Sequence, residues 1–117
     1  MSHRVIVYGL LRKGQSMAHL LAGARYLGRV DVEGYDLLNL GPYPAAVPGE
    51  GGIVGELYSL SNDPMLELLD EAEGVYAEPP LYYRESVDGK GKPAWIYVYA
   101  RDPEEAPKIP SGDWLER

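Results

Sequence analysis

The apolar positions of the chain fall in short runs that are separated by glycine and proline. Alternating or β-branched runs predict strands at residues 5–8, 26–40, 53–58, 82–87 and 94–100. Gly28 and Gly34 interrupt the second run, which indicates either two strands or one long bent strand. Pro48 to Gly52 have the composition of a loop. The segment from Asp102 onward is expected to be largely irregular.

Two segments instead carry the spacing of short helices. One lies among residues 16–22 and ends at Gly23. In the other, Asp63 is the expected cap, Pro64 suits the first helical position, and Gly74 ends an apolar stripe. Many short strands around two short helices predict an α+β fold. We expect one domain over residues 1–117, a small, mostly antiparallel β-barrel flanked by short helices.

Composition narrows the possible partners and compartments. The chain has 117 residues, a formal net charge of −7 and no Cys. The charge argues against nucleic acid as a partner, because that binding depends on Lys and Arg. No apolar run approaches the roughly 20 residues that span a bilayer, so no membrane partner is expected. We therefore expect a cytoplasmic protein that needs no disulfides.

Several common catalytic patterns are missing from the sequence. It contains no phosphate-binding Gly-Lys-Ser/Thr loop, no G-x-G-x-x-G and no H-E-x-x-H. None of its Ser residues lies in a G-x-S-x-G turn. His3 and His19 are the only histidines, and each is more typical of a structural residue. We accordingly expect no metal site and no cofactor.

The loop Tyr8-Gly9-Leu10-Leu11 is the first candidate site. A Gly at the end of a buried strand lets the backbone approach a ligand, and free N–H groups in such a turn bind carboxylates or oxyanions. An ordinary tight turn explains the same pattern.

Glu73 is the second candidate. It lies one helical turn beyond Leu69 and Asp70 and directly before Gly74. A carboxylate at a helix C-terminus is unfavourably placed in the helix dipole, so burial there raises its pKa toward neutrality. A solvated Glu at a frayed helix end is the alternative.

Tyr82, Arg84 and Tyr97 are further candidates for binding a substrate. Strand alternation places Tyr82 and Arg84 on one face of their strand, and Tyr97 shares a face with Trp95 and Tyr99. Core packing explains most of these residues, and one or two of them could face a pocket.

Five blocks of the sequence resemble the gamma-glutamylcyclotransferase-like, or AIG2-like, family. Residues 7–14 resemble its V-Y-G-x-L-R-x-G opening, and residues 69–74 its L-D-x-x-E-G block. Residues 82–87 are similar to Y-x-R-x-x-V, residues 94–99 to the final strand, and residues 111–114 to the usual ending. The blocks occur in the family's order and cover nearly the whole chain.

The resemblance implies a β-barrel with a cavity at one side and a γ-glutamyl compound as the small-molecule substrate. It implies that the backbone of Tyr8 to Leu11 holds the γ-glutamyl group and that Glu73 is the general acid/base. Relatives often carry Ser or Thr where this chain has Leu10, which leaves only backbone donors there.

The implied reaction releases 5-oxoproline and an amine, and needs neither Ser nor Cys because the substrate supplies the nucleophile. Two alternatives remain at this stage. One is a non-catalytic binding module on the same barrel, and the other is a different acyl transfer or hydrolysis of γ-glutamyl amides.

Overall fold

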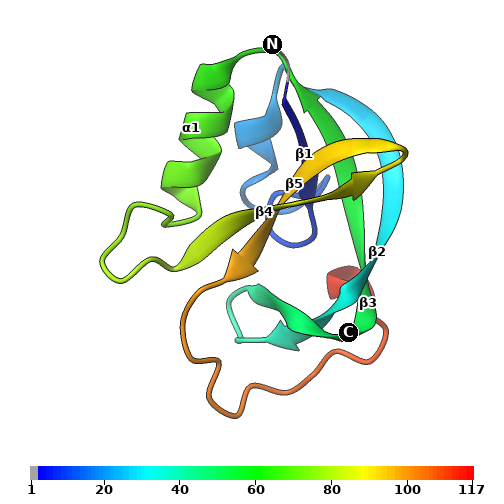
Figure 1. Ribbon diagram of the computed structural model, residues 1–117, viewed down its shortest axis with the longest axis vertical. Helices are drawn as coiled ribbons and strands as arrows, with labels where there is room; N and C mark the ends of the chain where they lie inside the picture. Colours follow the sequence, from blue (N-terminus) through cyan, green and yellow to red (C-terminus); the bar gives the residue numbers. More distant parts are fainter. Residues whose placement is uncertain (1–2) are drawn as a thin grey trace.

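The computed structural model describes residues 3–117, which form one five-stranded sheet with short helices beside it (Figure 1). The strands are β1 (His3–Val7), β2 (Arg25–Asn39), β3 (Pro44–Leu60), β4 (Tyr82–Gly89) and β5 (Lys92–Tyr99). The helices are α1 (Asp63–Ala72) and two 3₁₀ turns, η1 (Ala18–Leu21) and η2 (Trp114–Glu116). None of the helices within residues 3–117 is long and apolar enough to cross a membrane.

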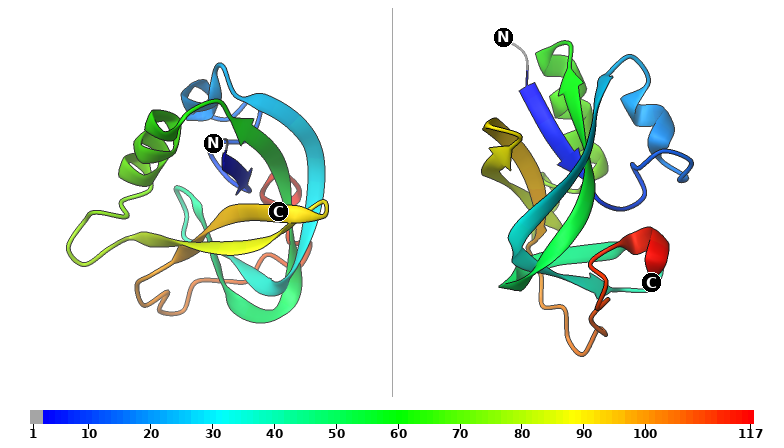
Figure 2. Two further views of the ribbon diagram at one scale, coloured as in Figure 1. Left: turned by 45° about the horizontal axis from the view of Figure 1, so that its top comes forward. Right: turned by 90° about the vertical axis from the view of Figure 1, so that its right-hand side faces the viewer.

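The sheet has the strand order β2-β3-β1-β5-β4 and is mostly antiparallel. Only the central pair β1 and β5 is parallel, while β1–β3, β2–β3 and β4–β5 are antiparallel. The long β2–β3 hairpin curves around the molecule and the β4–β5 hairpin crosses it, as the left view of Figure 2 shows. The predicted α+β, mostly antiparallel barrel is therefore confirmed, although the sheet is not closed.

Side chains link the edge strand β2 to the β4–β5 hairpin, although the two edge strands, β2 and β4, share no ladder of backbone hydrogen bonds. The Lys90 ammonium donates to the carbonyl of Leu27 at 3.0 Å, and the Tyr35 hydroxyl donates to the Glu85 carboxylate. Polar side-chain contacts therefore join the two edges of the barrel, which no backbone ladder closes.

The segment from Pro48 to Gly52 corrects one prediction, because it lies within β3 and not in a loop. Glu33 pairs with Gly52 and Tyr35 with Pro48, so three residues of β3 bulge out between them. The Asp36 carboxylate accepts the N–H of Gly51 at 3.1 Å. This side chain replaces the missing ladder contact, and tertiary pairing overrides the local Gly and Pro signal.

The second helix also begins differently from the prediction. Asn62, and not Asp63, is its N-cap, and the Asn62 side chain accepts the N–H of Met65 at 3.0 Å. Pro64 occupies the start of the helix as expected.

Two apolar clusters lie on opposite faces of the sheet. The first fills the barrel and includes Ile96, Val98 and Trp114. The second lies between the sheet and the helices, where Leu69 of α1 meets Tyr97 of β5. This second cluster is rich in Tyr and surrounds the candidate site.

Candidate functional site

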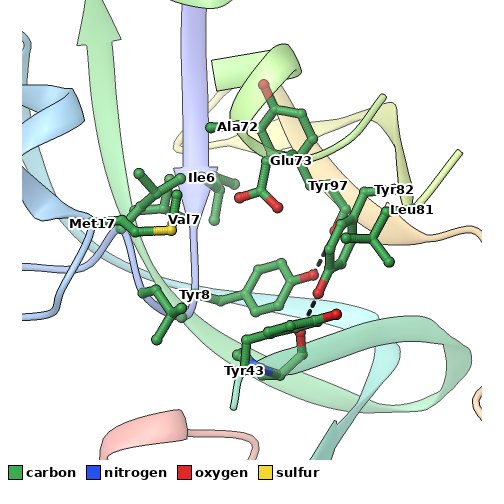
Figure 3. Close-up of a pocket in the computed structure, with 14 residues that line it drawn as sticks. Ile6, Val7, Tyr8, Met17, Tyr43, Ala72, Glu73, Leu81, Tyr82 and Tyr97 are labelled. Atoms are coloured by element: carbon green, nitrogen blue, oxygen red, sulfur yellow. Dashed lines mark hydrogen bonds between the residues drawn. The ribbon is translucent and has the colours of Figure 1, made fainter. Parts of the chain in front are cut away.

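A cavity of about 170 Å³ opens between the end of β1, the end of α1 and the β4–β5 hairpin (Figure 3). An apolar cavity of roughly 150 Å³ holds a molecule such as benzene, so this one suits a ligand of amino-acid size. The residues that line it are Ile6, Val7, Tyr8, Gly9, Leu10, Leu11, Met17, Tyr43, Pro44, Ala72, Glu73, Leu81, Tyr82 and Tyr97.

The loop after β1 forms one wall of the cavity. A turn closes it where the Arg12 N–H donates to the carbonyl of Gly9 at 3.0 Å. Gly9 is required by packing, because a Cβ there would lie 2.6 Å from Cγ of Pro44. Among the hydrogen bonds within residues 3–117, none has the N–H of Gly9, Leu10 or Leu11 as its donor. These groups are available to a ligand.

A buried ion network anchors this loop from behind. The Arg12 guanidinium lies 3.1 Å from the Glu56 carboxylate and 2.7 Å from that of Asp113. Glu56 also accepts the backbone N–H of Lys13 at 2.9 Å and the Tyr58 hydroxyl at 3.1 Å. Arg12 therefore positions the loop and does not bind a ligand. The local sequence does not predict this role, because its partners Glu56 and Asp113 are distant in the chain.

Glu73 owes its position to the way α1 ends. The Val75 N–H donates to the carbonyl of Asp70 at 3.0 Å, and the Gly74 N–H to that of Glu71 at 3.1 Å. These two bonds form a Schellman motif, with Gly74 in the left-handed conformation at φ 69°. Glu73 is the C-cap of the helix, and its carboxylate points into the cavity (Figure 3).

The surroundings of the Glu73 carboxylate favour its protonated form. Burial raises its pKa from an ordinary value of 4.5 to about 7, because desolvation penalises the charge. No basic side chain is among the described residues that line the cavity. A carboxyl with such a pKa can accept and return a proton near neutral pH.

Three buried tyrosines lie around this carboxylate, and each hydroxyl donates elsewhere. Tyr8 donates to the carbonyl of Tyr97 at 2.7 Å, and Tyr82 to that of Pro44 at 2.6 Å. The Tyr97 hydroxyl donates to Asp70 at 2.8 Å. Burial is the main cause that raises the pKa of all three hydroxyls, and the charge of Glu73 adds to it. None of these three hydroxyls therefore donates a hydrogen bond to the Glu73 carboxylate.

Arg84 is the predicted substrate-binding residue that the structure does not place on the cavity wall. Its Nε lies 2.9 Å from the carboxylate of Asp70, and its guanidinium stacks over the Trp95 ring at 4.5 Å. The other predicted residues, from the Tyr8 loop, α1, β4 and β5, all line the cavity. Arg84 is placed to hold Asp70, and through it Tyr97.

Sequence reasoning missed the side chains that complete the cavity from other segments. They include Met17, Tyr43, Pro44 and Leu81. None of the four carries a distinctive local pattern, because each is brought to the cavity by the packing of segments distant in sequence. Within residues 3–117 there is no group of three His, Asp or Glu side chains placed to hold a metal ion.

This architecture matches one known family along nearly the whole chain. The family model described as gamma-glutamyl cyclotransferase, AIG2-like, matches residues 5–116. The chain belongs to this family. The match confirms the family that the sequence blocks indicated.

Relatives in this family share both sequence and fold. The gamma-glutamylcyclotransferase family protein YtfP of Escherichia coli is 38% identical over 114 residues, which cover 97% of each chain. The solution structure of that protein superposes with a TM-score of 0.77, at 37% identity over 97% of this chain and 96% of the other. The crystal structure of the uncharacterized protein PH0828 from Pyrococcus horikoshii gives a TM-score of 0.83, at 32% identity over 97% and 91% of the two chains.

Proposed function

We propose that this protein is a γ-glutamyl cyclotransferase that releases 5-oxoproline from a γ-glutamyl amine or peptide. The observation that carries the proposal is the pairing of free backbone N–H groups at Gly9 to Leu11 with a half-buried carboxylate, Glu73, across one cavity. The first suits an oxyanion, and the second suits proton transfer.

The reaction begins with the α-ammonium of the γ-glutamyl group. Ionised Glu73 removes one of its protons, and the amine nitrogen attacks the γ-carbonyl carbon to close a five-membered ring. The N–H groups of the loop stabilise the oxygen that becomes negative. Attack within one molecule gains a large advantage in effective concentration, so no protein nucleophile is needed.

Collapse of the intermediate completes the exchange of bonds. The bond between the γ-carbon and the leaving nitrogen breaks, and Glu73 returns its proton to that nitrogen. The ring nitrogen still carries a second proton, which it gives to the regenerated Glu73 carboxylate, and Glu73 passes this proton to the released amine. The products are the lactam 5-oxoproline and the amine in its ammonium form. The pKa of about 7 allows Glu73 to act in both directions.

Arg84 and Asp70 act as positioning residues in this proposal. The ion pair between them fixes the Tyr97 hydroxyl, which forms the wall beside Glu73. Tyr8 and Tyr82 are fixed in the cavity wall by their hydrogen bonds to the carbonyls of Tyr97 and Pro44.

A panel of γ-glutamyl amides tests the reaction directly. Purified protein is incubated with each compound, and 5-oxoproline is measured by mass spectrometry. We expect 5-oxoproline and free amine in equal amounts from at least one compound. Free glutamate in place of 5-oxoproline would identify a hydrolase, and binding without any product would identify a binding module.

A further inference from the structure

Four half-buried side chains form the outer part of the cavity, and we call them the apolar rim. They are Leu10 after β1, Met17 before η1, Tyr43 between β2 and β3, and Leu81 before β4. They come from four separate segments of the chain, and all are apolar or aromatic. Figure 3 shows Met17, Tyr43 and Leu81 around the opening in front of Glu73.

The basic side chains near the cavity are already engaged. Arg12 is paired with Glu56 and Asp113 behind the loop, and Arg84 is paired with Asp70. The Lys13 ammonium lies 3.5 Å from the centre of the Tyr26 ring.

A fourth cation, Arg101, is held in the same way at the loop before β4. Its guanidinium donates to the carbonyl of Pro79 at 2.8 Å and to that of Pro80 at 3.4 Å. A charged group that leaves the cavity past the apolar rim therefore meets no unengaged cation among these residues.

We propose that the amine released by this enzyme carries an uncharged apolar substituent, which packs against Leu10, Met17, Tyr43 and Leu81. The inference rests on the proposed function and names the substrate class within it. The γ-glutamyl head occupies the inner part of the cavity between the Tyr8 loop and Glu73. The substituent on the leaving nitrogen then has the apolar rim as its path toward solvent.

Charge on this substituent is selected against for two reasons. A carboxylate, as in a peptide leaving group, loses hydration against the apolar rim and gains no cationic partner in return. It also enters a cavity in which Glu73 is the one carboxylate among the described lining residues, and none of these residues is basic, so the charge of ionised Glu73 repels it. A terminal ammonium loses hydration in the same way, while Glu73 is occupied by the reacting nitrogen.

Two matched pairs of substrates isolate the effect of charge. γ-Glutamyl-leucine and γ-glutamyl-isopentylamide differ by one carboxylate on the leaving amine. γ-Glutamyl-5-aminopentylamide and γ-glutamyl-hexylamide differ by a terminal ammonium in place of a methyl group. We expect kcat/KM to be at least about tenfold higher for the uncharged member of each pair. Equal values, or a preference for a charged member, overturn the inference.

A variant of the apolar rim sharpens the test. Met17→Lys places a cation of similar length at the opening, and Met17→Leu is the matched apolar control. We expect Met17→Lys to raise kcat/KM for γ-glutamyl-leucine relative to γ-glutamyl-isopentylamide by about tenfold. Met17→Leu should leave this ratio near that of the parent protein. A ratio that responds equally to both changes contradicts a role for charge at the rim.

Binding measurements separate this inference from the proposed reaction. Calorimetry on the unmodified protein gives the affinity for γ-glutamyl-leucine and for γ-glutamyl-isopentylamide. Absence of 5-oxoproline with every substrate overturns the proposed function. In that case, tighter binding of the isopentylamide still supports the apolar rim as the determinant of specificity, and equal affinities overturn it.

Discussion

Two carboxylates three residues apart, at the end of α1, have opposite surroundings. Asp70 is fully buried and accepts the Tyr97 hydroxyl at 2.8 Å, with the Arg84 Nε 2.9 Å away. Glu73 lies beyond it on the cavity wall, where burial raises its pKa to about 7. The difference shows how one helix end supplies both a fixed structural charge and a carboxyl that titrates near neutral pH.

The neighbouring groups, and not the residue types, separate these two roles. Asp70 accepts a hydrogen bond from the Tyr97 hydroxyl and is paired with the Arg84 guanidinium. Glu73 is left with apolar neighbours and with hydroxyls that donate to the backbone. Pairs of acidic groups whose environments differ in this way are typical of acid/base sites.

The largest effect is expected for turnover in Glu73→Gln. The amide cannot accept a proton, so 5-oxoproline formation should fall about a thousandfold. A stopped assay read by mass spectrometry measures it. Affinity for a γ-glutamyl amide should change little, and a variant that keeps most of its turnover would remove Glu73 from the mechanism.

Asp70→Ala should destabilise the fold by about 3 kcal/mol, because it leaves the Arg84 charge and the Tyr97 hydroxyl without their partner. Urea unfolding at pH 7 measures this loss. Glu73→Ala is the matched control, and it should cost clearly less because no ion pair is broken. Similar losses for the two variants would show that the environments are not as different as the contacts indicate.

Gly74→Ala should cost about 2 kcal/mol and also displace Glu73. An Ala at φ 69° is strained, and its Cβ would lie 2.8 Å from that of Leu81. Gly91→Ala provides the control, because Gly91 has φ 89° but no atom within 4 Å of an added Cβ. We expect the control to lose about 1 kcal/mol in the free energy of unfolding and to keep its full turnover. Equal losses of turnover would argue against a positional role of the Schellman motif.

The smallest effect is a pH-dependent gain of stability in Glu73→Gln. The folded state holds a proton on Glu73 up to about pH 7, whereas the unfolded chain releases it near pH 4.5. The contribution of Glu73 is therefore complete below pH 4.5 and is lost as the pH rises through 7. Partial exposure reduces this loss to about 1–2 kcal/mol.

Unfolding curves at pH 4.5 and pH 8 test this last prediction. Glu73→Gln should match the parent protein at the lower pH and exceed it by that amount at the higher pH. A parent protein that is the more stable of the two at pH 8 would contradict a half-buried, unpaired Glu73 carboxylate.

Much of the fold could be foreseen from local patterns. The β4–β5 hairpin followed from the two strands predicted at residues 82–87 and 94–100, and Lys90 and Gly91 between them adopt the positive φ that a tight turn needs. The α1 helix followed from its apolar stripe and Pro64. The bulge of β3 at residues 49–51 did not, because Asp36 stabilises it from another strand.

The candidate site divides in the same way. The motifs around Gly9 and Glu73 are readable in the sequence, since a tight approach and a helix end each need a particular residue type. The sequence does not predict the ion-pair partner of Arg84, because strand alternation tells which face a side chain lies on and not which residue it contacts. Only the meeting of β4, β5 and α1 assigned it to Asp70.

The sequence by itself determined the family, the strand and helix pattern, and the two motifs that meet at the cavity. Local chemistry is sufficient for these, because turns, caps and periodicity depend on neighbouring residues. The tertiary structure decided that Asp70 is ion-paired while Glu73 is not, and which side chains form the apolar rim. Both depend on desolvation and on partners distant in sequence, which act only once the sheet and α1 have packed together.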